Sequence, residues 1–280
     1  MTASAGPTTR PPLIALLTDF GEQDHYVGAL KGAILTVCPE ANVVDVVHEL
    51  PPHDVLGGAF ALAASYAFFP RGTTFVAVVD PGVGSERRAL AVAAAGYTFV
   101  GPDNGLLTLV LDRNAQAEVR AVTNQDLFRS EVSATFHARD VFGPVAAALA
   151  AGAPLASVGP PVRDPVRLHI PPVRAVGAGE WEAAILHVDR FGNLITTLDR
   201  PALDRMLDEV DADPTELVVV VEGEVMPLAT TYTDVAEGEA CALIGSSGYL
   251  EIAVHRGSAA RLLGASRGAA VRVRKALRSR

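Results

Sequence analysis

The chain has 280 residues, of which 49% are hydrophobic and 20% are charged, and its formal net charge is −9. The length exceeds one average domain and the apolar content supplies a packed core, while no apolar run approaches the roughly 20 residues that a membrane span needs. The negative charge argues against general nucleic-acid binding, because that binding depends on the neutralisation of phosphates.

The first half of the chain alternates strand and helix patterns. Short runs rich in valine and isoleucine indicate strands, and alanine- and leucine-rich segments between turn residues indicate helices. This alternation predicts an α/β domain over 13–158, with a mainly parallel central sheet covered on both faces. The expected elements are strand 13–18, helix 24–37, strand 42–47, helix 54–67 capped by Asp54, strand 74–80, a hairpin of 89–95 with 97–100, helix 106–111, strand 118–122 and helix 140–150.

The second half of the chain differs in composition. Five prolines within 159–179 disfavour a helix and predict an extended linker. Beyond it, short β patterns predict a smaller, all-β C-terminal domain over 180–275. The expected elements are strands 183–188, 194–198, 217–221, 225–228, 241–245, 249–254 and 270–273, with one short helix at 202–210.

The ends of the chain and its cysteines carry weaker signals. Residues 1–12 lack the apolar region of a signal peptide and indicate a short disordered lead. The segment 276–280 is a basic tail, either solvated or in contact with an acidic neighbouring subunit. Cys38 and Cys241 lie far apart without zinc-type neighbours, which predicts reduced thiols and a cytoplasmic location.

The segment 76–88, VAVVDPGVGSERR, has the most informative chemistry. The apolar run 76–79 brings Asp80 to a glycine turn, and Arg87 and Arg88 follow. Open α/β sheets bind ligands beyond the carboxyl ends of their strands, where this carboxylate is expected. The same residues could form a salt bridge that only braces the turn, so the segment by itself leaves both interpretations open.

Five further segments accompany it: TDFG at 18–21, GPDNGLL from Gly101, FHARD from Phe136, DRFGNLITT from Asp189 and SSGYLEIAV from Ser246. Together the six resemble the family of S-adenosylmethionine hydroxide adenosyltransferases over about 13–263. The resemblance implies hydrolysis of S-adenosylmethionine to adenosine and methionine, and kinship with enzymes that fluorinate or chlorinate this substrate. It also implies no metal or organic cofactor, and a homotrimer with sites between the N-terminal domain of one subunit and the C-terminal domain of its neighbour.

The resemblance assigns catalysis to Asp80, Arg87 and His137. Attack on the sulfonium substrate at ribose C5′ expels neutral methionine, so the leaving group needs no proton, whereas the water nucleophile needs activation. Asp80 would accept or organise the water proton, Arg87 would stabilise developing hydroxide character, and His137 would orient the cluster. Arg87 is preferred to Arg88 because the family's arginine stands seven residues beyond its aspartate.

The resemblance also supplies binding residues. Asp19 would bind the ribose diol, Asp189 would meet the methionine ammonium, and Asn193 would read the adenine edge. Phe136 is a candidate for packing against adenine, although it could be an ordinary core residue. The remaining candidates, near the methionine, are Asp24, Tyr26, Ser246, Glu251 and the backbone at Val254, with Asp24 alternatively starting the following helix.

Several alternatives follow from the residues themselves. A halogenase of the same family is disfavoured by Asp80, because a carboxylate about 4 Å from a halide costs about 4 kcal/mol at an effective dielectric near 20. A non-catalytic nucleoside- or S-adenosylmethionine-binding protein is left open, because only an assay excludes it. A metal-dependent hydrolase is disfavoured by the lack of HExxH or HxH spacing. Departures from the family pattern at Ala138, Ser247 and His255 leave the contacts there open.

Overall fold

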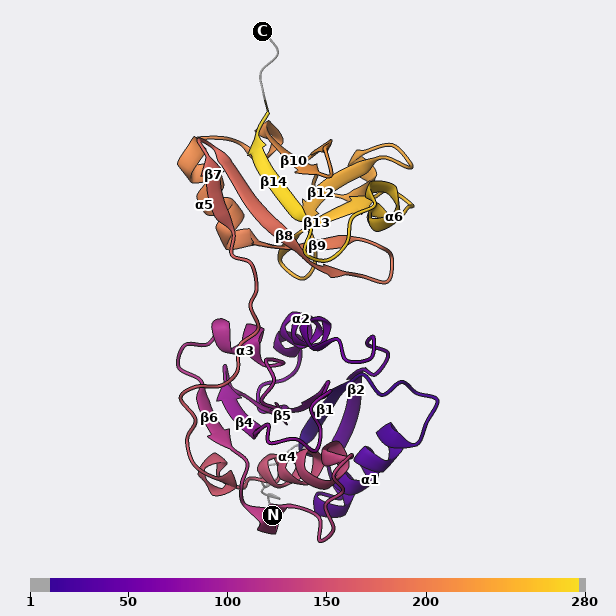
Figure 1. Cartoon of the computed structure of the whole chain (residues 1–280), viewed down its shortest axis with the longest axis vertical. Helices are drawn as coiled ribbons and strands as arrows, with labels where there is room; N and C mark the ends of the chain where they lie inside the picture. The colour runs from indigo at the N-terminus through magenta and orange to yellow at the C-terminus, as the bar shows by residue number, and fades with distance from the viewer. Residues whose placement is uncertain (1–10, 277–280) are drawn as a thin grey trace, which may run out of the picture. The chain divides into compact units, whose positions relative to one another are not determined.

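The chain forms two compact units, Met1–Leu168 and His169–Arg280 (Figure 1). The structure is a computed structural model that describes residues 11–276. Residues 1–10 of the expected lead and 277–280 of the expected basic tail therefore lie outside the described residues. Among the helices of 11–276, none combines the length and the apolarity that crossing a bilayer requires.

Within the described residues, a six-stranded mixed sheet forms the centre of the N-terminal unit. Its strands are β1 (Leu13–Thr18), β2 (Asn42–Val47), β3 (Thr74–Val78), β4 (Ala89–Ala94), β5 (Tyr97–Pro102) and β6 (Glu118–Ala121), in the order β2-β1-β3-β5-β4-β6. The β1–β2, β1–β3 and β3–β5 pairs are parallel, while β4 pairs antiparallel with β5 and β6. The sheet expected to be mainly parallel is thus mixed, because the expected hairpin forms its antiparallel edge.

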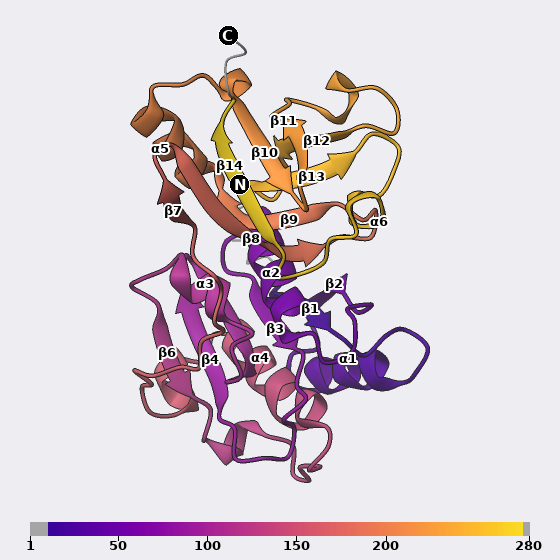
Figure 2. The ribbon, with the colours of Figure 1, turned by 45° about the horizontal axis from the view of Figure 1, so that its top comes forward.

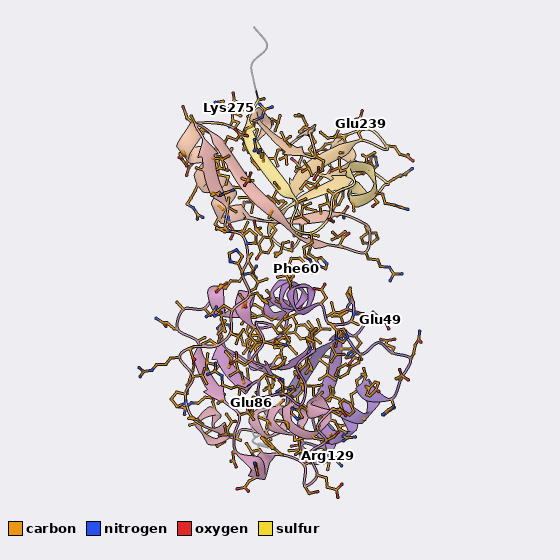
Figure 3. The ribbon with its side chains drawn as sticks, in the orientation of Figure 1. Glu49, Phe60, Glu86, Arg129, Glu239 and Lys275 are labelled. Atoms are coloured by element: carbon orange, nitrogen blue, oxygen red, sulfur yellow. The ribbon has the colours of Figure 1, made fainter. Side chains whose placement is uncertain are left out.

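Helices cover both faces of this sheet (Figures 1 and 2). They are α1 (Tyr26–Val37) and α4 (Gly143–Ala150) on one face, and α2 (Val55–Ser65) and α3 (Thr108–Asp112) on the other. Successive residues of β1 enter different cores: Ile14 and Leu16 pack with α1 and α4, whereas Ala15 and Leu17 pack with α2. Burial on both faces explains why this strand is an uninterrupted apolar run. Figure 3 shows the side chains that fill these layers.

The starts of α1 and α2 test two expectations about aspartates. The Asp54 carboxylate accepts a hydrogen bond from the backbone N–H of Gly57 at 2.9 Å, which confirms it as the N-cap of α2. α1 begins at Tyr26, and its N-cap is His25. The expectation that Asp24 starts this helix is therefore wrong.

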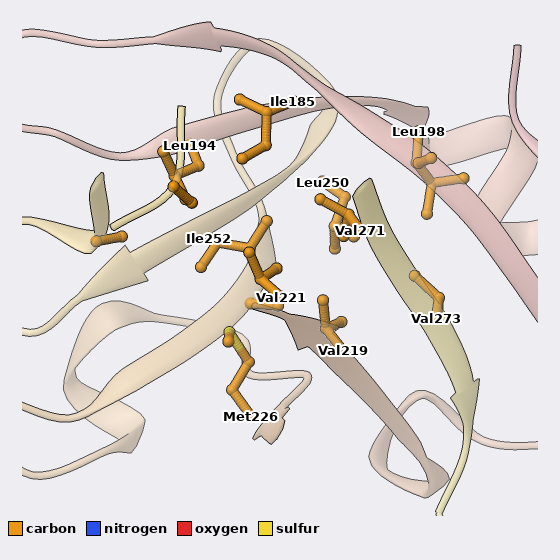
Figure 4. Close-up of a cluster of buried hydrophobic side chains, with 14 of the residues drawn as sticks. Ile185, Leu194, Leu198, Val219, Val221, Met226, Leu250, Ile252, Val271 and Val273 are labelled. Atoms are coloured by element: carbon orange, nitrogen blue, oxygen red, sulfur yellow. The ribbon is translucent and has the colours of Figure 1, made fainter. Parts of the chain in front are cut away.

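Among the described residues of the C-terminal unit, eight strands form an antiparallel sheet. They are β7 (Arg174–Gly177), β8 (Glu180–Val188), β9 (Leu194–Asp199), β10 (Leu217–Val221), β11 (Glu224–Pro227), β12 (Ala240–Ile244), β13 (Tyr249–Val254) and β14 (Ala270–Lys275). The order is β11-β10-β14-β8-β9-β13-β12, with β7 beside β8. A bridge from Leu228 to Ala242 links the two end strands, so the sheet nearly closes into a barrel. Residues such as Val219, Leu250 and Ile252 fill its interior (Figure 4).

Two expectations for this region need correction. The segment 159–179 is not wholly a linker, because β7 forms within it, and Arg174 pairs with Glu182 on β8. The C-terminal unit is also not all-β. It contains α5 (Arg200–Val210), close to the helix expected at 202–210, and the short α6 (Ala259–Leu263). A single helical turn such as α6 is too short for hydrophobic periodicity to identify.

Candidate active site

The carboxyl ends of β1 and β3 lie next to each other at a topological switch point of the sheet. After β1, the chain forms β2 on one side of it and then crosses over to form β3 on the other side. Thr18 at the end of β1 pairs with Val78 at the end of β3, so Asp19 and Asp80 come to the same edge of the sheet. Open α/β sheets bind their ligands at such a switch point.

A cleft of about 540 Å³ opens at this edge and is called the first cleft. The predicted site residues that line it are Asp19, Tyr26, Asp80, Phe136 and His137. Its lining also includes Phe20, His53 and Arg139, which the sequence analysis did not identify. The volume lies in the range of small-molecule sites.

The three residues predicted to be catalytic form one hydrogen-bonded set, called the Asp-Arg-His group. The Nε atom of Arg87 donates to Oδ1 of Asp80 at 2.9 Å, and its Nη2 donates to Oδ2. The same Nη2 lies 3.0 Å from Nδ1 of His137. The side chains of Asp80 and Arg87 are only 5% and 10% exposed, so water screens this pair weakly.

The contact with Arg87 fixes the state of the His137 ring. A guanidinium has no acceptor, so Nδ1 of His137 accepts the hydrogen bond and the neutral ring carries its proton on Nε2. Burial lowers the pKa of His137, and the positive charge of Arg87 lowers it further, against the opposing charges of Asp80 and Asp140. The imidazole is therefore neutral at pH 7.

A tight turn brings Arg87 back to Asp80. The turn is closed by a hydrogen bond from the backbone N–H of Val83 to the carbonyl of Asp80 at 3.2 Å. Gly84 adopts a φ of 80°, and a Cβ there would lie 2.5 Å from the carbonyl oxygen of Ala134. Only glycine allows this close approach between the turn and the segment that precedes His137.

Arg88, the alternative catalytic arginine, bonds elsewhere. Its Nε donates to Asp103 at 2.6 Å, and its Nη1 donates to Asp164 at 2.8 Å. These bonds attach part of the expected linker to the N-terminal unit. Arg87, and not Arg88, therefore bonds to Asp80, and the preference for Arg87 as the catalytic arginine stays a prediction.

His137 immediately precedes a π-helical turn, η3 (Ala138–Phe142). Asp140 in this turn is fully buried and accepts two hydrogen bonds from Arg139 at 2.7 Å and one from the backbone of Ser133 at 2.9 Å. These bonds hold the loop before His137 against the turn. π-Helical turns occur frequently at functional sites. The helix expected at 140–150 is thus this turn followed by α4.

Aromatic rings bound the first cleft. The ring of Tyr26 meets that of Phe136 edge to face at 5.3 Å, and Phe20 meets Phe136 similarly at 6.0 Å. Phe136 is buried and also lines the cleft, so its two interpretations, core residue and ligand contact, are compatible. Asp24 is exposed and is not part of this lining.

Asp19 stands beside these rings and is held by the backbone. Its Oδ2 accepts a hydrogen bond from the N–H of His53 at 2.8 Å. His53 has a φ of 68°, an uncommon conformation for a non-glycine residue, which points its N–H at Asp19. No local sequence pattern reveals such a backbone conformation, so sequence reasoning missed His53.

In the C-terminal unit, Asp189 and Asn193 form a tight turn. Oδ1 of Asp189 accepts from the backbone N–H groups of Phe191 and Asn193, and its Oδ2 accepts from the Asn193 side chain at 3.0 Å. Asn193 and Val254 line a cleft of about 560 Å³, called the second cleft. Its lining also includes Phe191, Tyr232 and Arg256.

Glu251 lies behind this turn. It is 6% exposed and accepts a hydrogen bond from the hydroxyl of Tyr232 at 2.7 Å. Burial raises the pKa of Glu251, and Asp189 raises it further, while the Tyr232 hydrogen bond opposes both. Burial and then the hydrogen bond to Glu251 raise the pKa of Tyr232 to about 12. Glu251 is not part of the second-cleft lining, but it holds the hydroxyl of Tyr232, which is.

Ser246 is not brought to the second cleft. It is exposed in the turn that connects β12 and β13, which a hydrogen bond from Gly245 to Tyr249 closes. It is not part of the second-cleft lining. Over residues 11–276, no group of three or more His, Cys, Asp or Glu side chains has the arrangement of a metal site.

The chain is similar to known proteins over nearly its whole length. The family models for the SAM hydroxide adenosyltransferase N-terminal and C-terminal domains match residues 14–159 and 183–272. Proteins named (R)-S-adenosyl-L-methionine hydrolase from Salinispora tropica and Thermus thermophilus are 42% and 40% identical to it, covering 94% and 93% of this chain and 97% and 98% of theirs. A fluorinase from Actinoplanes sp. is 31% identical, over 88% of this chain and 92% of that protein. The crystal structure of an uncharacterized conserved protein from Thermotoga maritima matches with a TM-score of 0.86 and 35% identity, covering 94% of this chain and all of that one.

Proposed function

The chain belongs to the S-adenosylmethionine hydroxide adenosyltransferase family, and we propose that it hydrolyses S-adenosyl-L-methionine to adenosine and L-methionine. The observation that carries this proposal is the Asp-Arg-His group at the edge of the first cleft. The relatives named hydrolases are 40–42% identical to the chain, and they support the same reaction.

The bonds that change define what the enzyme supplies. The oxygen of a water molecule forms a bond to ribose C5′, the C5′–sulfur bond breaks, and its electron pair stays on sulfur as the neutral thioether of methionine. The water oxygen must lose one proton. The leaving group requires none, so a base and a positioned positive charge are sufficient, without a metal or organic cofactor.

Asp80 is the proposed base. Each of its oxygens accepts a hydrogen bond from Arg87 and retains a further lone pair for the attacking water. Arg87 keeps the carboxylate oriented and stabilises developing negative charge on the water oxygen. The neutral His137 ring fixes the guanidinium through Nδ1 and carries its proton on Nε2.

The remaining residues are proposed ligands of the substrate. Asp19 has Oδ1 for the ribose diol, since its Oδ2 takes the His53 N–H. Asn193 donates through Nδ2 to Asp189, so its Oδ1 is suited to accept from the amino group of adenine. The methionine contacts proposed from the resemblance are those of Asp24, Tyr26, Asp189 and Ser246, with Glu251 and Val254 close by.

We also propose a cytoplasmic homotrimer that joins the first cleft of one subunit to the second cleft of its neighbour. The division of the proposed ligands between two units supports this arrangement, because each cleft holds only part of the set. The free thiols Cys38 and Cys241 support a reducing compartment.

Incubation of the protein with S-adenosylmethionine in H₂¹⁸O, with and without added chloride or fluoride, tests the proposed reaction. Mass spectrometry should find methionine and adenosine with one ¹⁸O at the 5′ position, at a yield that does not depend on halide. Formation of a 5′-halo-adenosine would show that the protein is a halogenase and not a hydrolase. The absence of any product would favour a non-catalytic binding protein.

A further inference from the structure

Two buried polar side chains, Thr18 and His48, lie next to the turn that carries Asp19 and connect it to the more exposed Asp45 and Lys31. Oγ1 of Thr18 lies 2.8 Å from Nδ1 of His48, and both residues are almost completely buried. Nε2 of His48 lies 2.9 Å from Oδ1 of Asp45, in a close contact that is not an aligned hydrogen bond. The other oxygen of Asp45 accepts from Lys31 on α1 at 2.7 Å. Burial of polar groups such as those of Thr18 and His48 is costly unless they have partners, so this pair needs a physical account.

An irregularity in β2 brings these side chains together. Leu16 of β1 pairs with Asp45, but the next residue, Leu17, pairs with Val47, so one residue of β2 is skipped. In a regular strand, side chains three positions apart point to opposite faces. The skipped residue reverses this alternation, and Asp45 and His48 therefore face each other.

His48 holds the Asp19 turn through both its side chain and its backbone. The Thr18 hydroxyl that contacts its ring accepts a hydrogen bond from the N–H of Phe20 at 3.3 Å. The carbonyl oxygen of His48 accepts from the N–H of Gly21 at 2.9 Å. The next residue, Glu49, labelled in Figure 3, accepts from the N–H of Glu22 at 3.0 Å. The backbone after Asp19 is thus bonded to the segment that follows β2, and Thr18 before it contacts the same segment through its side chain.

The Thr18 hydroxyl determines which way hydrogen bonds run through this set. Oγ1 accepts from Phe20 and can also donate its single proton, and the carboxylate of Asp45 near Nε2 of His48 can only accept. The tautomer that suits both neighbours carries its proton on Nε2, towards the carboxylate of Asp45, and accepts from Thr18 at Nδ1. The ring thus bonds to Thr18 at Nδ1 and lies beside a negative charge at Nε2, and it favours the rotation of the Thr18 hydroxyl that leaves an oxygen lone pair for Phe20.

We propose that His48 is a positioning residue that acts through Thr18 to aim the carboxylate of Asp19 at the ribose diol. This proposal rests on the proposed function, in which Asp19 binds the ribose. His48 does not touch the substrate itself. His48 fixes the backbone conformation of residues 18–21. The carboxylate of Asp19 is therefore already oriented when the vicinal diol of the ribose binds.

The test compares binding of adenosine with binding of 2′,3′-dideoxyadenosine by isothermal titration calorimetry on the full-length protein. The two ligands differ only in the diol, so the ratio of their Kd values reports on the Asp19 contact. A hydrogen bond to a charged group contributes at least about tenfold in affinity, and we expect the unmodified protein to prefer adenosine by that factor. Asp19→Asn should reduce the preference to about threefold or less.

Thr18→Val keeps the shape of the side chain but removes the hydroxyl, and it should reduce the preference as Asp19→Asn does. Thr36→Val, which removes an exposed hydroxyl on α1 that bonds only within its helix, is the matched control and should leave the preference unchanged. At His48, asparagine can place an acceptor near Nδ1, whereas glutamine places its amide near Nε2. His48→Asn should therefore retain more of the preference than His48→Gln.

The outcomes separate this proposal from the proposed function. Weaker binding of both ligands by the same factor in Thr18→Val and His48→Gln, with an intact preference, would overturn the positioning role. Circular dichroism melting of each variant identifies those that fail to fold, and Thr18→Val, which preserves volume, is the decisive variant. A protein that prefers adenosine but releases none from S-adenosylmethionine would overturn the proposed reaction and leave the positioning role standing.

Discussion

The two clefts of this chain carry different polar chemistry. In the first cleft, the paired charges of Asp80 and Arg87 adjoin a neutral imidazole and a space bounded by aromatic rings. At the second cleft, Asn193 of the lining bonds to Asp189, which lies outside the lining and also accepts from the backbone of their turn. The first arrangement is suited to moving a proton and stabilising charge, and the second to fixing a shape that a ligand can recognise. We therefore expect changes in the Asp-Arg-His group to alter kcat and changes at Asn193 in the second cleft to alter KM.

Apart from Asp80 itself, the largest effect on kcat is expected at Arg87. Arg87→Gln removes the charge that orients Asp80, and kcat should fall by about 10²–10³-fold, as when other charge-stabilising donors are removed. Arg88→Gln is the matched control, because this neighbour bonds to Asp103 and Asp164 instead. Steady-state kinetics of both variants should show a loss of kcat at Arg87 alone. Equal losses would contradict the distinct roles.

The pH dependence of the first cleft should reflect the state of His137. Burial and Arg87 lower its pKa, and the neutral ring is the form that accepts from Arg87. kcat/KM should therefore fall about tenfold per pH unit only below the ordinary histidine pKa of about 6.5. The unfolded chain binds this proton more readily, so the stability that the neutral ring contributes is present above pH 6.5 and is lost as the pH falls through the lowered pKa.

A pH–rate profile and pH-dependent urea unfolding check both statements. In His137→Gln the fall of kcat/KM below pH 6.5, the acidic limb of the profile, should disappear. It should remain in His169→Gln, which changes an exposed histidine of the C-terminal unit. An unchanged limb in His137→Gln would assign it to another group.

In the second cleft, Asn193→Ala removes the side chain proposed to bind adenine. KM for S-adenosylmethionine should rise about tenfold while kcat changes less than about twofold, since one hydrogen bond is lost without a change in the reacting groups. Asn124→Ala, which removes a comparable turn amide from the N-terminal unit, is the control. A decrease of kcat without a change of KM in Asn193→Ala would contradict the different roles proposed for the two clefts.

The smallest effect on turnover is expected at Tyr232. Tyr232→Phe leaves the buried Glu251 without the hydroxyl that it accepts from, and the free energy of unfolding should fall by about 1–3 kcal/mol. The deficit should shrink at low pH, because a protonated Glu251 needs this donor less. Urea denaturation at pH 5 and pH 8 measures it. The double variant with Glu251→Gln should recover part of the loss, and equal stability of Tyr232→Phe and the unmodified protein would contradict this account.

Much of the fold could be predicted from the sequence because local signals were strong. The runs at 13–18, 42–47, 217–221 and 249–254 are mostly apolar, and each forms a strand with those bounds. Features that depend on long-range pairing could not be predicted. The register shift in β2 and the pairing of β7 arise from neighbouring strands and leave no local pattern.

The candidate site could be predicted only in part, because motif spacing identifies residues along the chain but not where the fold places them. The seven-residue spacing from Asp80 to Arg87 and the FHARD segment came from the resemblance, and the structure brings Asp80, Arg87 and His137 together. Asp24 and Ser246 also matched the family pattern, but neither is part of a cleft lining in this chain. His53 was missed because an unusual backbone conformation brings its N–H to Asp19. Tyr232 was missed because the capping box of Thr231 and Asp234 indicates a helical turn there but not its position beside the second cleft.

Asp80→Asn is the variant that tests the central claim most directly, with S-adenosylmethionine binding measured by calorimetry and turnover measured by chromatography on the same preparation. The account predicts that turnover falls by about 10²–10⁴-fold, as expected for loss of a general base, while the Kd changes only a few-fold. Asp164→Asn, which changes an exposed aspartate bonded to Arg88, should keep both values. Normal turnover by Asp80→Asn would contradict the assignment of the reaction to the Asp-Arg-His group.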